Sequence, residues 1–154
     1  MGKIDPSKAQ EFKGTGYPKP FDAPVLARAW KSLGDVAGIS QFGVNLVTLE
    51  PGVWSSQRHW HMHEDEFVWV LEGDVVLVTD AGETPMTAGE CAGFKAGERD
   101  GHCFRNLSSR DVKLLVVGTR VERDYGEYSD IDMTFESEAK DGESVFRRKS
   151  GEPY

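Results

Sequence analysis

Residues 52–73 read GVWSSQRHWHMHEDEFVWVLEG, and three of the four histidines in the chain occur there at alternate positions. Successive side chains of a strand point to opposite faces, so His59, His61 and His63 would project from one side, with neighbours about 6.6 Å apart. Two neighbouring imidazoles can bind one metal ion, whereas the outer two on a straight strand are separated by about twice that distance. One of the three histidines must therefore have another role.

Glu66 and His102 can complete a set of metal ligands. Glu66 opens the next apolar run after a short turn, which would bring its carboxylate back towards the imidazoles. His102 precedes another predicted strand, just after a glycine-containing loop. Three imidazoles and one carboxylate inside a barrel suit one divalent transition metal per subunit, which could be Fe(II), Mn(II), Ni(II), Cu(II) or Zn(II). Because imidazoles must be neutral to bind, we expect the metal affinity to fall as the pH drops towards about 6.

Between residues 42 and 119, glycine turns divide the sequence into short apolar runs. Examples of these turns are Pro51-Gly52, Glu72-Gly73 and Ala81-Gly82. Turn signals spaced by roughly eight to twelve residues, without a helical period between them, are typical of a β-sandwich or barrel. The sequence therefore predicts an all-β domain with about eight strands in this region.

The run FVWVL at residues 67–71 is apolar on both faces of a strand. If Val68 and Val70 fill the interior, the alternate residues form an outer apolar surface that requires a cover. These outward-facing residues are Phe67, Trp69 and Leu71. The cover could be a second subunit, which predicts a homodimer, or it could be the aromatic-rich segment 1–40.

The chain divides into three parts around the predicted barrel, which we place at residues 41–120. The sequence YPKPFDAP at 17–24 favours an extended chain, because proline fixes its own φ and keeps the preceding residue out of the helical region. We therefore interpret residues 1–40 as an extended N-terminal arm that packs on the barrel. Residues 121–154 are richer in acids and turn formers, and we expect them to form a partly ordered tail.

Length and composition exclude several classes of protein. A chain of 154 residues and 17.1 kDa fits one domain. A formal net charge of -8 and a pI near 5.0 oppose binding to nucleic acid, which depends on clustered lysine and arginine. No apolar run approaches the roughly 20 residues of a membrane helix and the N-terminus lacks a secretory signal, so we expect a cytoplasmic protein without a membrane partner. We expect Cys91 and Cys103 to remain buried thiols.

The segment 52–73 resembles the first motif of the cupin superfamily. That motif consists of a glycine, five residues, HxH, three or four residues, a glutamate, six residues and a glycine. His61 is followed by four residues and Glu66, and six further residues precede the closing glycine, as in the motif. Six residues rather than five separate the opening glycine from His59. The resemblance implies that His59 and His61 are the ligand pair and that His63 is spare.

Residues 89–106 resemble the second cupin motif, which consists of a glycine, five residues, PxG, two residues, a histidine, three residues and an asparagine. The opening glycine is followed here by Gly97, His102 and Asn106. Lys95 stands where proline is expected, and four residues rather than two separate Gly97 from His102. These departures affect turns and leave the ligands in place. The implied metal ligands are His59, His61, Glu66 and His102.

The resemblance implies a small double-stranded β-helix, or jelly-roll β-barrel, of a kind that is often dimeric. The chain is most similar to single-domain cupins described as sugar-phosphate-isomerase-like. Four ligands on a metal that prefers six would leave two adjacent positions for a substrate. We therefore expect a metal-dependent isomerase, lyase or dioxygenase that acts on a small oxygen-rich molecule, such as a sugar phosphate or a hydroxy or keto acid. The alternative is a non-catalytic module that binds a sugar or a carboxylate.

Strand parity also identifies candidates for residues beside the ligands. Gln57 and His63 would share the face of the ligand pair, and Phe104 and Asn106 would share the face of His102. We expect His63 to act as a catalytic group in proton transfer. We expect the other three to contact the substrate, and they are Gln57, Phe104 and Asn106.

Overall fold

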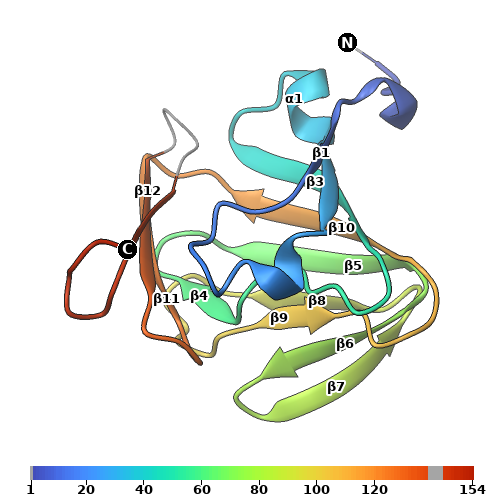
Figure 1. Cartoon of the computed structure of the whole chain (residues 1–154). Coiled ribbons are helices and arrows are strands. Elements are labelled where there is room, and N and C mark those ends of the chain that lie inside the picture. Colours follow the sequence, from blue (N-terminus) through green and yellow to red (C-terminus); the bar gives the residue numbers. More distant parts are fainter. Residues whose placement is uncertain (1, 139–143) are drawn as a thin grey trace.

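The computed structural model describes residues 2–138 and 144–154, and most of its regular structure is β-strand (Figure 1). The strands are β1 (Glu11–Lys13), β2 (Ala29–Ser32), β3 (Phe42–Leu49), β4 (His59–His61), β5 (Glu66–Glu72), β6 (Asp74–Thr79), β7 (Gly82–Thr87), β8 (Cys91–Phe94), β9 (Cys103–Arg105), β10 (Val112–Thr119), β11 (Arg123–Tyr128), β12 (Thr134–Glu138) and β13 (Ser144–Arg147). The short helices are η1 (Pro6–Lys8), η2 (Ala23–Val25) and α1 (Leu33–Ala37). Within the described residues, no helix is both long and apolar enough to span a membrane.

Eight strands, β3 to β10, lie between residues 42 and 119, a stretch that is described throughout. This number confirms the prediction from the turn pattern. One antiparallel sheet has the order β1-β2-β3-β10-β5-β8, and a second has the order β7-β6-β9. These sheets form the walls of a barrel, with β4 near one end (Figure 1). The all-β class and the double-stranded β-helix, or jelly-roll, fold are confirmed.

The apolar core lies between these two sheets. In β5, Val68 and Val70 are fully buried while the residues between and beside them are exposed, as strand alternation requires. Leu114 of β10 and Phe104 of β9 are buried in the same cluster. Complete burial of one such side chain contributes about 1.5–3 kcal/mol. The core therefore fixes β5, which begins at Glu66, and β9, which follows His102.

The two flanking segments are built into the fold more fully than the sequence predicted. From the N-terminal segment, β1 and β2 extend the six-stranded sheet. From the segment after residue 120, β11, β12 and β13 form a sheet with β4. Tyr17 and Phe21 pack on a buried cluster of C-terminal residues, which are Tyr128, Met133 and Phe135. Residues 139–143 of the expected tail lie outside the described residues.

The outer face of β5 is not covered by the described chain. Phe67, Trp69 and Leu71 have exposed fractions of 39%, 44% and 47%. Cys91 of β8 pairs with Trp69 of β5, so its side chain points to the same outer face and is exposed. The expectation of a buried thiol is therefore wrong for Cys91 and confirmed for Cys103.

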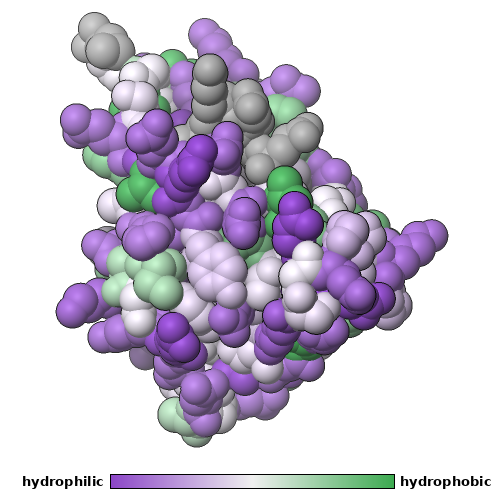
Figure 2. Space-filling model, turned by 90° about the vertical axis from the view of Figure 1, so that its left-hand side faces the viewer, coloured by the Kyte–Doolittle hydropathy of each residue, from purple (hydrophilic) through white to green (hydrophobic). Residues whose placement is uncertain are grey.

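The face formed by the C-terminal strands differs from the apolar outer face of β5, because it is largely hydrophilic (Figure 2).

Candidate metal centre

The predicted ligand pair lies on β4, a strand of only three residues. His59 and His61 share one face of it, and Trp60 between them is buried at 4% exposure. β4 pairs with β11, where Gly126 is opposite His61. On the other side, an isolated bridge joins His59 to His102. β4, which carries two candidate ligands, is therefore held by β11 on one side and by the third candidate ligand, His102, on the other.

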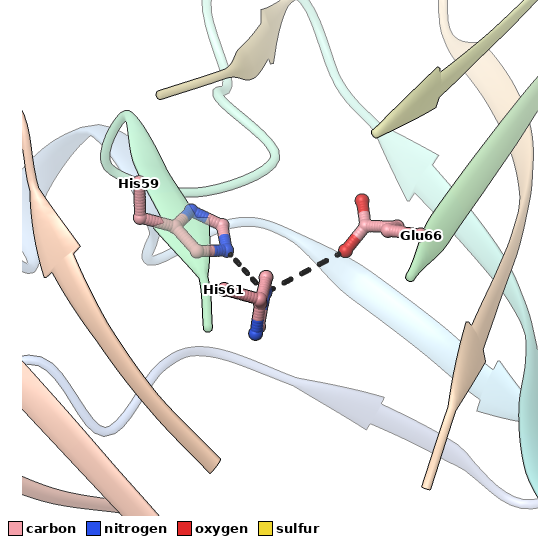
Figure 3. Close-up of side chains that lie close together, drawn as sticks. All are labelled: His59, His61 and Glu66. Atoms are coloured by element: carbon pink, nitrogen blue, oxygen red, sulfur yellow. Dashed lines mark hydrogen bonds and ion pairs between the residues drawn. The ribbon is translucent and has the colours of Figure 1, made fainter. Parts of the chain in front are cut away.

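Glu66, the first residue of β5, brings its carboxylate towards this pair (Figure 3). One ligand atom from each of His59, His61 and Glu66 lies within 4.8 Å of the others. The Nε2 atom of His61 is 3.9 Å from Oε2 of Glu66. The turn at 62–65 reverses the chain, so ligands that are close in sequence converge from two different strands.

Hydrogen bonds determine which nitrogen of each imidazole carries a proton. Nδ1 of His59 lies 2.9 Å from the carbonyl oxygen of Gln57, and Nδ1 of His61 lies 2.6 Å from Oδ2 of Asp124. A carbonyl and a carboxylate can only accept, so each Nδ1 donates. In a neutral imidazole, the Nε2 atom then presents a free lone pair.

The two Nε2 atoms of His59 and His61 face each other at 3.0 Å. Two lone pairs at this distance repel unless a cation or a proton lies beside them. Two nitrogens that bind one ion at about 2.1 Å from neighbouring corners of an octahedron would be about 3.0 Å apart, so the pair fits a divalent metal. Without a metal, a proton on His61 can take this place. Burial alone would lower the pKa of His61, but Asp124 and Glu66 raise it above its ordinary value.

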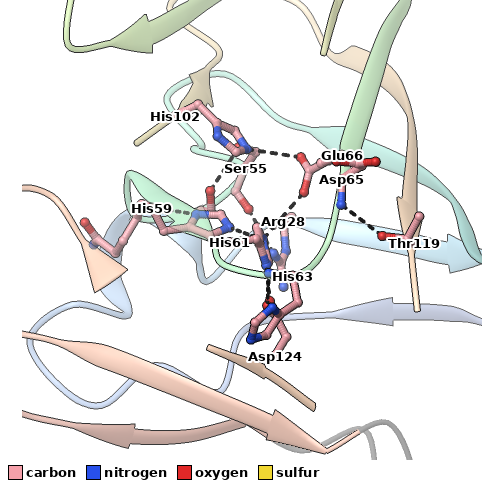
Figure 4. Close-up of polar contacts among 12 residues, drawn as sticks. Arg28, Ser55, His59, His61, His63, Asp65, Glu66, His102, Thr119 and Asp124 are labelled. Carbon is pink, nitrogen blue, oxygen red and sulfur yellow. Dashed lines mark hydrogen bonds and ion pairs between the residues drawn. The ribbon is translucent and has the colours of Figure 1, made fainter. Parts of the chain in front are cut away.

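His102, the fourth candidate ligand, is 2% exposed. Its ring stacks on Phe94 with the centroids 3.5 Å apart, and its Nε2 atom is 3.4 Å from Oε1 of Glu66 (Figure 4). Neither ring nitrogen has a hydrogen-bond partner among the described residues. An unpartnered buried nitrogen costs about 1–3 kcal/mol, and a metal beside Glu66 would satisfy it. His102 stands slightly apart, since neither of the two groups of possible ligand atoms within 4.8 Å of one another includes it; they are His59, His61 and Glu66, and His61, Glu64 and Asp124.

Burial and neighbouring charges keep two of the candidate ligands in the protonation state that a metal ion requires. Burial, together with His61 and His102, lowers the pKa of His59 to about 3. Burial by itself would raise the pKa of Glu66, but the imidazoles of His102, His59 and His61 lower it to about 2. At neutral pH, His59 is therefore neutral and Glu66 is ionised.

Asp124 on β11 supports the centre and was not identified from the sequence. Its side chain is 1% exposed, and it accepts hydrogen bonds from Nδ1 of His61 and from the backbone N–H of His63, at 2.6 and 2.8 Å. A carboxylate in this position orients a ligand histidine and increases its basicity. Nothing in the sequence distinguishes Asp124 from the other acidic residues, of which the chain has 26 in all.

Comparison with known proteins identifies the family of this chain. The family model described as Cupin domain matches residues 45–118. A solved structure from Silicibacter pomeroyi, described as a sugar phosphate isomerase from a cupin superfamily, is 46% identical over 99% of this chain and 96% of that chain, with a TM-score of 0.94. This chain belongs to the cupin superfamily.

Two further solved structures resemble this cupin. A candidate sugar phosphate isomerase from Acidithiobacillus ferrooxidans is 29% identical over 80% of this chain and 78% of that chain, with a TM-score of 0.73. The polyketide cyclase RemF from Streptomyces resistomycificus is 22% identical over 77% and 79% of the two chains, with a TM-score of 0.61, and shows the fold alone. No curated protein matches the chain. The match to the family model ends at residue 118, so Asp124 lies beyond it.

A cavity of about 350 Å³ opens beside the candidate ligands of this cupin. His61 and His102 line it, together with the apolar side chains of Leu77 and Phe94 and the carboxylate of Glu64. Glu64 is half-buried, and this burial raises its pKa above the ordinary value. The cavity therefore combines two candidate ligands, apolar walls and a carboxylate with increased proton affinity.

Two of the residues predicted to lie beside the ligands have other neighbours. β4 ends at His61, so strand alternation does not extend to His63, which is exposed. The side-chain amide of Gln57 donates a hydrogen bond to the carbonyl oxygen of Phe21 at 2.7 Å. Neither His63 nor Gln57 lines the cavity, so the geometry gives their predicted roles no support.

The other two predicted residues stabilise the fold, one in the apolar core and the other by hydrogen bonds. Phe104 is 2% exposed and belongs to the apolar core. The amide nitrogen of Asn106 donates to the carbonyl oxygens of Leu49 and Arg110, and its oxygen accepts from Ser108, so all its polar atoms hold a turn. Neither side chain lines the cavity, whereas Glu64, which does, was not selected from the sequence.

Proposed function

We propose that this cupin is a metal-dependent enzyme of the isomerase, lyase or dioxygenase type that acts on a small oxygen-rich molecule. The observation that carries the proposal is the pair of Nε2 atoms of His59 and His61, which face each other at 3.0 Å while each Nδ1 is already engaged. Glu66 and the unpartnered ring nitrogen of His102 would complete the ligand set. A divalent ion held there would act as a Lewis acid towards a substrate oxygen.

The side chains around the ligands would supply the remaining functions. Asp124 keeps a proton on Nδ1 of His61 and leaves its Nε2 free. Leu77 and Phe94 form apolar walls that exclude water from part of the cavity. Glu64 is the titratable group best placed to accept or donate a substrate proton, since it lines the cavity and its pKa is raised. Such a group favours an enzyme over a module that only binds a sugar or a carboxylate.

Metal analysis of the purified protein tests the ligand set. His61→Ala should reduce the metal content to below about a tenth of the wild-type value, because it removes one of the two Nε2 atoms that face each other. His63→Ala is the matched control and should keep nearly all the metal, since its side chain is exposed outside the cavity. Equal loss in both variants, or a wild-type protein that takes up no divalent metal, would contradict the proposal.

We also propose that the protein is a homodimer in the cytoplasm. The uncovered face of Phe67, Trp69 and Leu71 supports a second subunit, because the described N-terminal segment leaves it exposed. Both cysteines are free, which agrees with a reducing compartment.

A further inference from the structure

Negatively charged side chains outnumber positively charged ones in the lining of the cavity. Besides the ligands, it is lined by the carboxylates of Glu64, Glu98 and Asp100 and by a single cationic side chain, that of Lys95. Within the described residues, none of the three carboxylates forms an ion pair with a lysine or an arginine. The cavity wall therefore carries unpaired negative charge.

The arginine side chains nearby are engaged elsewhere. Arg58 donates hydrogen bonds to Asp130 and Asp80. The guanidinium of Arg99 lies over the ring of Trp60, 5.2 Å from its centroid. Neither arginine lines the cavity, and no residue of a described helix does, so no helix N-terminus is available to bind an anion.

A divalent ion at the centre does not reverse this balance. Its two positive charges and the cation of Arg28, which interacts with Glu66, would face the carboxylates of Glu66 and Asp124, so one positive charge would remain beside the cavity. Lys95 would still face three carboxylates. A phosphate monoester carries about −1.5 to −2 charges at neutral pH and is normally bound by arginine, lysine or a helix N-terminus. Placing it here would bring like charges together, and because Glu98 and Asp100 are exposed, the repulsion should depend on the salt concentration.

We propose that this cavity takes an unphosphorylated, hydroxyl-bearing molecule such as a free sugar or polyol, an inference that rests on the proposed function of the same site. The hydroxyl groups would donate hydrogen bonds to Glu98 and Asp100, and the C–H faces would contact Leu77 and Phe94. A cavity of about 350 Å³ is within the size range of small-molecule sites. This ligand class differs from the sugar phosphates in the names of two relatives.

Calorimetric titration with inorganic phosphate tests the inference in metal-loaded and metal-free protein. The double variant Glu98→Gln/Asp100→Asn should bind phosphate at least about tenfold more tightly than the wild type, because two like charges are removed. The difference should shrink as the salt concentration rises. The control variant Glu136→Gln/Glu152→Gln makes the same change in net charge at exposed positions away from the cavity, and should bind phosphate like the wild type.

Equal phosphate affinity in the wild type and in Glu98→Gln/Asp100→Asn would overturn the inference. A sugar phosphate that stabilises the metal-loaded wild type against thermal unfolding more than its parent sugar would overturn it as well. The metal content is measured separately. A protein without metal would contradict the proposed function, and the phosphate titrations of the metal-free protein would still decide the inference about charge.

Discussion

At the scale of single residues, the two candidate ligand histidines of β4 and their hydrogen-bond partners decide whether the protein can hold a metal ion. His59 and His61 each use Nδ1 for a hydrogen bond within the protein, and so direct both Nε2 atoms at one point. The spacing of the pair is visible in the sequence because strand alternation is a local property. Asp124 is 63 residues from His61 along the chain, and its contact depends on tertiary structure.

Asp124→Asn should weaken metal binding about 10- to 100-fold. The asparagine oxygen can accept from His61 or from the backbone of His63, but its amide group would then face the other donor. Competition with a chelator measures the metal affinity, and nitrogen NMR of metal-free protein reports the His61 tautomer, which a purely structural defect would not alter. Asp111→Asn, an exposed change, is the control. A metal affinity of Asp124→Asn within about twofold of the wild type would show that Asp124 does not position His61.

At the scale of elements, β11 is the strand that makes a three-residue β4 possible. A strand of this length cannot persist alone, and its register is set by pairing with β11 and by the bridge to His102. The segment after residue 120 was expected to be a partly ordered tail, yet it supplies both this pairing and Asp124. The sequence could not reveal this, because the apolar periodicity of β11 is weak and its partner strand lies far earlier in the chain.

Gly126→Ala should separate β11 from β4. A Cβ at this position would collide with the carbonyl oxygen of Trp60 and with the ring of Phe135. We expect a loss of roughly 2–4 kcal/mol in the free energy of unfolding and weaker metal binding. Denaturant unfolding and metal analysis measure the two effects. Gly16→Ala is the control, since its Cβ would make only an ordinary contact, 3.7 Å from Phe146. Equal stability of the two variants would contradict the close approach of β11 to β4 at Gly126.

At the scale of the whole molecule, the outer face of β5 is an apolar surface that the described chain leaves exposed. The valines of β5 are fully buried, while Trp69 is 44% exposed between Phe67 and Leu71. The sequence left two possible covers for this face. The structure leaves the second subunit as the proposal, because β1 and β2 extend the sheet at its edge instead of crossing its outer face.

Trp69→Glu should convert the proposed homodimer into monomers. A carboxylate at the centre of an apolar interface would lose its hydration without a partner charge, at a cost of several kcal/mol. Light scattering coupled to size exclusion measures the mass. Val145→Glu, at an exposed apolar position on β13, is the control and should leave the mass unchanged. A wild-type protein with the mass of a single chain would contradict the dimer.

The sequence by itself determined the strand pattern of the barrel and the four candidate ligands, because turn residues, strand alternation and motif spacing are all properties of neighbouring positions. Only the tertiary structure decided what surrounds those ligands. Pairing between distant strands brought Asp124 to His61. The loop between β8 and β9 brought Glu98 and Asp100 to the cavity, and Phe94 at the end of β8 lines it as well. The end of β4 at His61 removed His63 from the face that alternation had assigned to it. Local spacing thus fixes which side chains can bind a metal, whereas long-range packing fixes the charge and shape of the cavity beside them.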